Sequence, residues 1–143
     1  MQFDAKQFKY QLPLQLRWRD VDALQHVNNA VYLTYLEMAR GRYFTDVYEW
    51  DWDNDGMILA NVSINYRLPI LLTDKSTILT RISQVGNKSF TMEYVITVER
   101  HGQILVACTA TSVQVMYDYT TQQTLAIPPH LKLRIADYEG IEI

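Results

Sequence analysis

The side chains best suited to chemistry in this 143-residue chain lie close together, between residues 20 and 29. They are two carboxylates, one imidazole and two carboxamides: Asp20, Asp22, His26, Asn28 and Asn29. A carboxylate can serve as a general base or as a nucleophile, and unpaired N–H groups at a helix start can stabilise a developing oxyanion. Asp and Asn are also common in loops, where they bond to nearby backbone. Residue types alone therefore leave open a hydrolytic site and an ordinary turn.

Most of these residues also have a purely structural interpretation. Asp20 is expected to form an ion pair with Arg17 or Arg19. Asn29 directly precedes a helical pattern and is suited to cap it, while Asn28 is suited to brace the loop. The imidazole between them could simply bond to backbone in a turn. The choice between these roles depends on the elements that hold the segment in place.

The segment follows a predicted strand and precedes a predicted helix. Leu12, Leu14, Leu16 and Trp18 occupy every second position of residues 10–18, which is typical of a strand with one buried face. Because proline cannot donate a ladder hydrogen bond, the proline within this run predicts an edge strand. Residues 19–28 are polar and aperiodic, and are expected to form a loop.

A helix is predicted from Ala30 to about Val47. At 100° per residue its small and polar residues fall on one narrow stripe, and nearly everything else as far as Ala39 is apolar. A helix that is apolar over most of its circumference must be wrapped by other elements. The stripe consists of Ala30, Thr34, Glu37, Gly41 and Thr45.

Four β-type runs follow an acidic and aromatic loop at residues 48–56. Tight hairpin turns at Gly86-Asn87 and His101-Gly102 separate the later runs. A short strand or turn at 122–127 and a short terminal helix after Pro128-Pro129 complete the chain. The predicted strands span residues 57–67, 75–85, 88–100 and 103–117.

This order of elements predicts a single domain over residues 1–143. We expect an α+β fold in which a long central helix is wrapped by a curved antiparallel β-sheet of five to six strands. Long strands joined in a meander twist and coil strongly, which supplies the wrap that the helix requires.

Composition excludes several classes of function. The chain has 13 Lys and Arg against 16 Asp and Glu, a formal net charge of −3, which argues against a nucleic-acid binder. One cysteine excludes an intrachain disulfide framework and a cysteine-based zinc site. No apolar run approaches the roughly 18 residues of a membrane span, and the polar start lacks a signal-peptide core. We therefore expect a cytoplasmic protein.

The segment RDVDALQHVNNAVYLTYLEMAR (Arg19–Arg40) resembles the start of hotdog-fold thioesterases of the 4-hydroxybenzoyl-CoA and acyl-CoA thioesterase type. The resemblance implies that Asp22 is the catalytic carboxylate. The string QHVNNAVY is also similar to plant acyl-ACP thioesterases, in which an Asp, an Asn and a His are implicated in catalysis. Asp22 and His26 match that pattern, whereas Leu24 stands at the position of the catalytic Asn.

Residues 62–96 and 113–129 are similar to the later strands of the same family. There a proline is usually followed five residues later by an aspartate, as Pro69 and Asp74 are here. The resemblance further implies oxyanion or positioning roles for backbone near Asn28, Asn29 and Gly56. It also implies contacts with coenzyme A from residues in the next hairpin, Lys88 and Ser89.

The function implied by the resemblance is hydrolysis of an acyl-CoA to a carboxylic acid and free CoA. Asp22 would act as nucleophile or as general base, with His26 orienting it, a water or the substrate. No cofactor and no metal are expected, because coenzyme A is part of the substrate. The family also implies a homodimer or homotetramer with active sites between protomers. An alternative is a non-catalytic hotdog module that binds acyl-CoA or acyl carrier protein, and a hydratase on the same fold is a further one.

Four residues outside the loop need a separate interpretation. Glu37 is a rival carboxylate, although an ion pair with Arg40 three residues later explains it equally well. Cys108 lies in an apolar alternating run and is expected to be a buried structural residue. Trp50 and Trp52 either line an acyl pocket or serve in packing.

Overall fold

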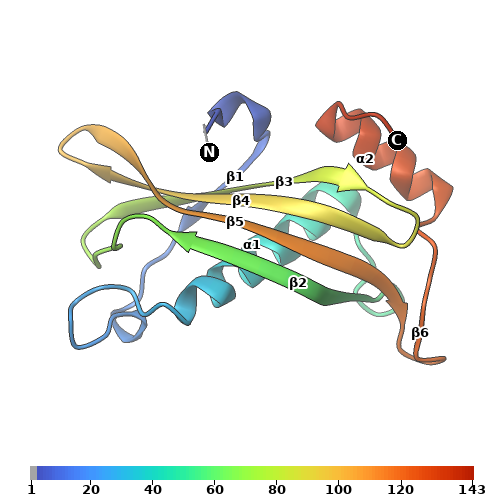
Figure 1. Cartoon of the computed structure of the whole chain (residues 1–143), viewed down its shortest axis with the longest axis horizontal. Helices are drawn as coiled ribbons and strands as arrows, with labels where there is room; N and C mark the ends of the chain where they lie inside the picture. The colour runs from blue at the N-terminus through green and yellow to red at the C-terminus, as the bar shows by residue number, and fades with distance from the viewer. Residues whose placement is uncertain (1–2) are drawn as a thin grey trace.

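The structure is a computed structural model that describes residues 3–143, and its centre is one antiparallel sheet. The strands lie in the order β1-β3-β4-β5-β2, with β6 paired to β5 (Figure 1). The elements are η1 (Ala5–Gln7), β1 (Tyr10–Leu14), η2 (Trp18–Asp20), α1 (Val31–Tyr48), β2 (Met57–Tyr66), β3 (Lys75–Val85), β4 (Ser89–Arg100), β5 (Gln103–Asp118), β6 (Gln123–Thr124) and α2 (Pro129–Glu139), where η denotes a 3-10 helix.

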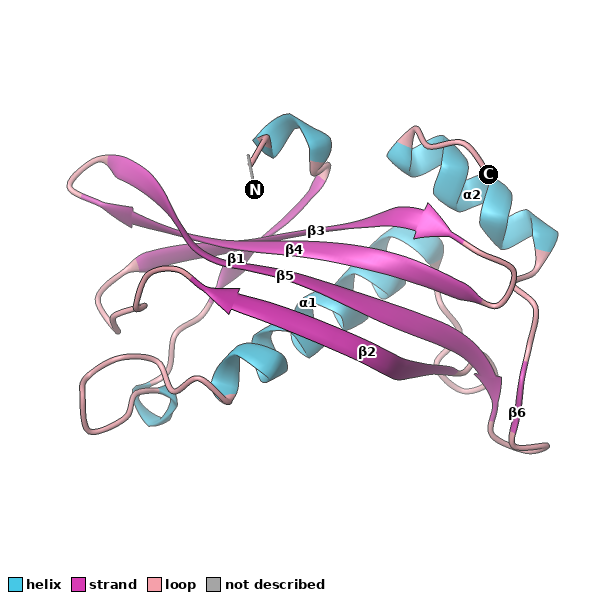
Figure 2. Ribbon diagram, in the orientation of Figure 1, coloured by secondary structure: helices cyan, strands magenta, loops and turns pink. Residues whose placement is uncertain are grey.

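Helix α1 lies against one face of this curved sheet (Figure 2). Its aromatic and small residues recur every three or four positions and form the centre of the hydrophobic core. The sheet covers only one side of the helix, because Leu33 and Met38 remain 44% and 42% exposed on the other. The residues that α1 buries are Tyr32, Tyr35, Leu36, Ala39, Tyr43, Phe44 and Tyr48.

The sheet has two edges of different character. β1 is one edge, as Pro13 predicted, and it pairs only with β3. β2 is the other edge; it pairs with β5 on one side, and most of its side chains are exposed or half-buried. The unpaired side of β2 therefore presents free backbone donors and acceptors along the strand.

The first strand is shorter than the alternation predicted, because it ends at Leu14. Trp18 was expected on the buried face of that strand, but it lies in η2 and is 84% exposed. The reason is local, since the Asp20 carboxylate accepts hydrogen bonds from the backbone and guanidinium of Arg17 and closes a 3-10 turn. The alternation of apolar residues in the sequence therefore extends beyond the end of β1 and into the turn.

The expected terminal helix is present as α2, with Pro129 in its first turn and Gly140 in the left-handed conformation that closes it. Glu139 anchors this helix: its carboxylate accepts hydrogen bonds from the Tyr43 hydroxyl and from the Ile82 amide at 3.1 Å. The helix is thereby tied to both α1 and β3. No helix among residues 3–143 is long and apolar enough to span a membrane.

Candidate active site

Asp20 anchors the corner between the first strand and the loop. Its side chain is only 2% exposed, and it accepts hydrogen bonds from Arg17 at 3.1 Å and from the Tyr35 hydroxyl at 2.7 Å. Burial raises the pKa of this carboxyl, but the bonds from Tyr35 and Arg17 outweigh burial and hold the pKa below its usual range. The predicted ion pair with Arg17 is confirmed, and Asp20 has a structural task.

A tight hairpin follows this corner. Val21 and Val27 pair as an isolated antiparallel bridge, and the Asp22 amide donates to the His26 carbonyl at 2.9 Å. At the tip the Gln25 amide donates to the Asp22 carbonyl at 2.9 Å. These bonds fix the backbone that carries Asp22, so its carboxylate is held out from the fold in a defined direction.

The Asp22 carboxylate is exposed at the rim of a cavity of about 550 Å³. One of its oxygens, Oδ1, accepts a hydrogen bond from the Leu24 amide at 2.9 Å, which leaves Oδ2 for other partners. The cavity is walled mainly by apolar side chains, so an apolar group could pack there beside a free carboxylate oxygen. The other lining residues are Trp18, Val21, Gln25, Leu71, Leu72 and Thr73.

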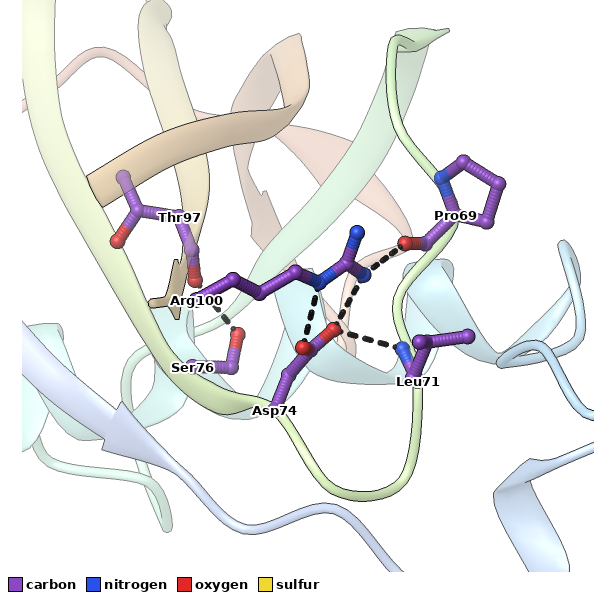
Figure 3. Close-up of polar contacts among 6 residues, drawn as sticks. All are labelled: Pro69, Leu71, Asp74, Ser76, Thr97 and Arg100. Carbon is purple, nitrogen blue, oxygen red and sulfur yellow. Dashed lines mark hydrogen bonds and ion pairs between the residues drawn. The ribbon is translucent and has the colours of Figure 1, made fainter. Parts of the chain in front are cut away.

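The far wall of this cavity belongs to the loop between β2 and β3, which an ion pair clamps (Figure 3). Arg100 donates to both oxygens of Asp74, at 2.6 and 2.5 Å, and to the Pro69 carbonyl at 2.6 Å. Asp74 also accepts from the Leu71 amide at 2.8 Å. Burial raises the pKa of the Asp74 carboxyl, but these bonds together lower it below its usual range.

The two walls are joined by backbone pairing. The Val27 amide donates to the Ile70 carbonyl at 2.8 Å, and His26 forms an isolated bridge with Leu71. The Asp74–Arg100 clamp and the Asp20 anchor therefore hold opposite sides of one cavity. The spacing of Pro69 and Asp74 was the sequence signal for this loop; nothing in the local pattern indicated that Trp18 or Leu72 would lie beside Asp22.

His26 is not among the residues that line this cavity. It lines a second hollow of about 190 Å³, with Tyr66 and Asn29 among its neighbours. The backbone of His26 supports Asp22. The two predicted catalytic residues are thus joined through a backbone hydrogen bond, while each lines a different cavity.

Only one of the two asparagines has its expected task. Ala30 rather than Asn29 occupies the N-cap position of α1, and it makes no side-chain cap bond, so the predicted cap is wrong. Asn28 instead accepts a hydrogen bond from the Ala30 amide at 2.9 Å, as a loop brace does. The Asn29 carbonyl accepts from the Tyr66 hydroxyl at 2.9 Å, which fixes the end of β2 against the start of α1.

Gly56, Lys88 and Ser89 lie at the starts of β2 and β4, which are at the opposite end of α1 from the loop that precedes this helix (Figure 1). Their backbones pair with the last part of β5, whereas Asp22 precedes α1, an 18-residue helix about 27 Å long. A Cβ on Gly56 would come within 2.2 Å of the Tyr117 carbonyl, so close strand approach explains this glycine. Within one chain these residues do not meet Asp22.

A third cavity, of about 560 Å³, lies between α1 and β2. Glu37, Arg40 and Trp52 line it. The expected ion pair between Glu37 and Arg40 is wrong, because the Arg40 guanidinium donates to the Tyr94 hydroxyl at 3.2 Å instead. Trp50 is buried in packing, so the two neighbouring tryptophans have different roles.

Among residues 3–143, no group of three or more histidines, cysteines or carboxylates is arranged to hold a metal ion. The loop itself offers side chains and backbone donors for chemistry. A carboxylate with one free oxygen, next to an apolar cavity and the start of a helix, is suited to attack on an activated carbonyl carbon.

A single helix held by a curved antiparallel sheet, with this loop before the helix, defines the class of protein. Residues 16–135 match the thioesterase-like superfamily, and the chain belongs to it. The predictions of a hotdog fold and of a thioester hydrolase are confirmed.

Three relatives illustrate the match. Long-chain acyl-CoA thioesterase FadM of Escherichia coli (strain K12) is 36% identical over 128 residues, which cover 87% of this chain and 96% of that protein. A thioesterase from Thermus thermophilus, crystallised with coenzyme A and zinc, has a TM-score of 0.82 and 31% identity, covering 96% of this chain and 99% of that chain. A mutant 4-hydroxybenzoyl-CoA thioesterase complexed with 4-hydroxybenzoyl-CoA has a TM-score of 0.81 at 17% identity, covering 88% and 97%, and shows the fold alone.

Proposed function

We propose that the protein is an acyl-CoA thioesterase that hydrolyses its substrate to a carboxylic acid and free CoA. The observation that carries the proposal is the Asp22 carboxylate at the rim of an apolar cavity, in a chain 36% identical to a long-chain acyl-CoA thioesterase. The coenzyme A bound to the thioesterase from Thermus thermophilus supports the same class of substrate. A thioester carbonyl is reactive enough for a positioned carboxylate and a few N–H donors to suffice.

Two routes use the same carboxylate. In the first, an Asp22 oxygen attacks the acyl carbon, the carbon–sulfur bond breaks, and CoA leaves as a thiolate that takes up a proton. Water then hydrolyses the resulting mixed anhydride and restores Asp22. In the second, Asp22 accepts a proton from a water molecule as that water attacks the acyl carbon directly. Both routes consume one water and release one thiol.

His26 supports the site in two ways. Its carbonyl accepts the Asp22 amide hydrogen bond, so it holds the carboxylate through the backbone. His26 also lines the neighbouring hollow, from which its imidazole would bond to the substrate. Substitution of the imidazole should accordingly raise KM more than it lowers kcat.

The complete site is formed by two copies of the chain. β2 has an unpaired edge, and antiparallel pairing of two such edges about a two-fold axis sets the start of one β2 beside the end of the other. Gly56 precedes the start of β2, while Tyr66 at its end bonds to Asn29 beside α1. The Gly56–Lys88 end of one protomer therefore reaches the Asp22 end of its partner, in a homodimer that can pair further into a homotetramer.

Sedimentation tests this assembly. We expect a dimer or tetramer at micromolar protein concentration, because the unpaired β2 edge is long and open. A folded species of 16.7 kDa under those conditions would contradict the shared site. Hydrolysis by such a monomer would place all catalytic groups within one chain.

The activity is tested with a panel of acyl-CoAs of increasing chain length, by following the free thiol. Asp22→Asn is expected to lower kcat by about 10²- to 10⁴-fold, because the amide is neither a base nor a nucleophile. Asp137→Asn, on the exposed face of α2, is the matched control and should leave kcat unchanged. An Asp22→Asn protein with unchanged kcat would refute the assignment, and a loss in Glu37→Gln instead would move the carboxylate to α1.

One observation favours a second candidate, a module that binds acyl-CoA or acyl carrier protein without hydrolysis. Leu24 takes the place of the Asn that the acyl-ACP thioesterase pattern carries, and its side chain is 74% exposed, so no amide acts there. Tight binding of acyl-CoA or of acylated carrier protein without release of thiol would favour this module. Release of thiol from only one of the two compounds, acyl-CoA or acylated carrier protein, would show which of them is the substrate.

A further inference from the structure

Gln25 has an unusual backbone conformation for its residue type. Its φ is +64°, in the left-handed region, at the tip of the hairpin that carries Asp22. The turn that ends at this residue is closed by the bond from the Gln25 amide to the Asp22 carbonyl. Short hairpins of this kind usually have glycine at the left-handed position, because any Cβ there meets the backbone. A glutamine at position 25 therefore costs stability.

Among residues 3–143 three other non-glycine residues have positive φ: Glu49, His101 and Gln122. Glu49 ends helix α1, and the other two lie in the turns after β4 and β5. Each occupies a chain reversal or a helix end that calls for this conformation, and so does Gln25. Gln25 differs from the other three because it lines the cavity that Asp22 also lines.

Gln25 lines the same cavity as Asp22. The two residues are three apart, and the hydrogen bond that closes the turn between them fixes the backbone from which both side chains project. A carboxamide offers an acceptor oxygen and two N–H donors in one plane, whereas a glycine would offer none. Asp22 Oδ2 accepts no hydrogen bond from the described part of the chain, so it has room for a water molecule.

We propose that the Gln25 carboxamide positions the water molecule consumed in thioester hydrolysis. The inference rests on the proposed function. The amide oxygen accepts one hydrogen of the water while Asp22 accepts the other, which aims a lone pair of the water oxygen at the acyl carbon. Gln25 gains and loses no proton. In direct attack the proton of the water goes to Asp22 and then to the departing thiolate, and in anhydride hydrolysis it goes to the Asp22 carboxylate that is released. The left-handed conformation of Gln25 thus lowers stability, and in return the side chain supplies a polar group at the reacting centre.

Gln25→Gly and Gln122→Gly form a matched pair of variants. Both remove a glutamine side chain from a left-handed position in an exposed turn, so both should raise Tm by a similar amount. Gln122 lies in the turn between β5 and β6, and β6 is at the opposite end of α1 from the loop that precedes this helix and carries Asp22 of the same chain (Figure 1). Only Gln25→Gly should lower kcat, by roughly 10- to 100-fold, because the attacking water loses its orientation. KM should change by less than about twofold, since substrate binding is untouched.

Two further variants separate the amide from the backbone. Gln25→Leu keeps the left-handed strain and most of the side-chain volume but removes the amide, so it should lose kcat without any rise in Tm. Gln25→Asn keeps an amide and suits the left-handed region, so it should recover part of kcat. The readouts are initial rates of thiol release from an acyl-CoA and thermal unfolding of each variant.

A wild-type kcat in Gln25→Gly or Gln25→Leu overturns the inferred role of the Gln25 carboxamide. An equal loss of kcat in Gln122→Gly overturns it as well. Wild-type protein that releases no thiol contradicts the proposed function together with this inference. Hydrolysis by the wild type with unaffected Gln25 variants contradicts only the role of Gln25.

Discussion

Asp20 and Asp22 are two carboxylates of one short loop with opposite environments. Asp20 is buried and accepts hydrogen bonds from Arg17 and Tyr35, whereas Asp22 is exposed and accepts one bond, from the Leu24 amide. The first has its hydrogen-bonding capacity taken up within the fold. The second keeps an oxygen free beside a cavity.

This contrast shows how one loop can be firmly anchored and still keep a carboxylate oxygen free. The hydrogen bonds that anchor the loop converge on Asp20, so Asp22 can remain exposed. Asp74 repeats the arrangement on the opposite wall of the cavity, where Arg100 and the Leu71 amide occupy its oxygens. Substitutions at the anchoring residues should therefore cost stability, and those at Asp22 should cost activity.

The largest effect on stability is expected from Asp20→Ala. The variant leaves the Tyr35 hydroxyl buried without its acceptor and Arg17 without its partner, so the free energy of unfolding should fall by about 3 kcal/mol. Urea unfolding measures the change. The control is Asp22→Ala, which removes an exposed carboxylate and should stay within about 0.5 kcal/mol of the wild type. Equal losses of unfolding free energy in the two variants would contradict the proposed difference between Asp20 and Asp22.

A smaller loss is expected from Arg100→Lys. Lysine keeps the charge but cannot donate to both Asp74 oxygens and the Pro69 carbonyl in one plane, so we expect a loss of about 1–2 kcal/mol. Arg42→Lys is the matched control, because Arg42 forms an exposed pair with Asp46 at 3.5 Å and should change stability by less than about 0.5 kcal/mol. An Arg100→Lys protein as stable as the control would mean that the loop needs no clamp.

The smallest and most diagnostic effect is on how steeply the free energy of unfolding declines in acid. The carboxyl pKa values of Asp20 and Asp74 are lower in the folded protein than in the unfolded chain, so both carboxylates stabilise the fold at neutral pH. That contribution is lost as pH falls below the unfolded value of about 3.9, towards the lower folded values. Urea unfolding from pH 7 to pH 3 should show a steeper decline for the wild type than for Asp20→Asn or Asp74→Asn. Parallel curves would show that neither carboxylate stabilises through its charge.

The sequence predicted the elements well where the pattern was local and continuous. Residues 75–85 form β3 as expected, and the predicted helix at 30–47 appears as α1 within one residue at each end. Alternation and helical spacing are properties of neighbours in the chain, so the sequence contains them directly. The ion pair between Asp20 and Arg17 belongs to the same group, because its partners are three residues apart.

The failures arose where a distant partner decided the outcome. Arg40 bonds to Tyr94, 54 residues away, instead of the adjacent Glu37. Trp18 is a different case, because a local turn closed by Asp20, two residues away, removed it from its predicted strand. The predicted contribution of Lys88 to the Asp22 site concerns two protomers and stays a prediction, since α1 separates the two residues within one chain. That Asp22 lies beside the loop of Leu71 depends on the order of strands, which no single segment determines.

The burial of Cys108 has a practical consequence. This cysteine, the chain's only one, is 1% exposed in the core, and burial raises the pKa of its thiol to about 12. A thiol that is neither ionised nor accessible reacts very slowly with disulfide reagents. Colorimetric titration of sulfhydryl groups will therefore register only coenzyme A set free by turnover, with no background from the folded enzyme, and alkylating agents can be used to quench such reactions without modifying the native protein.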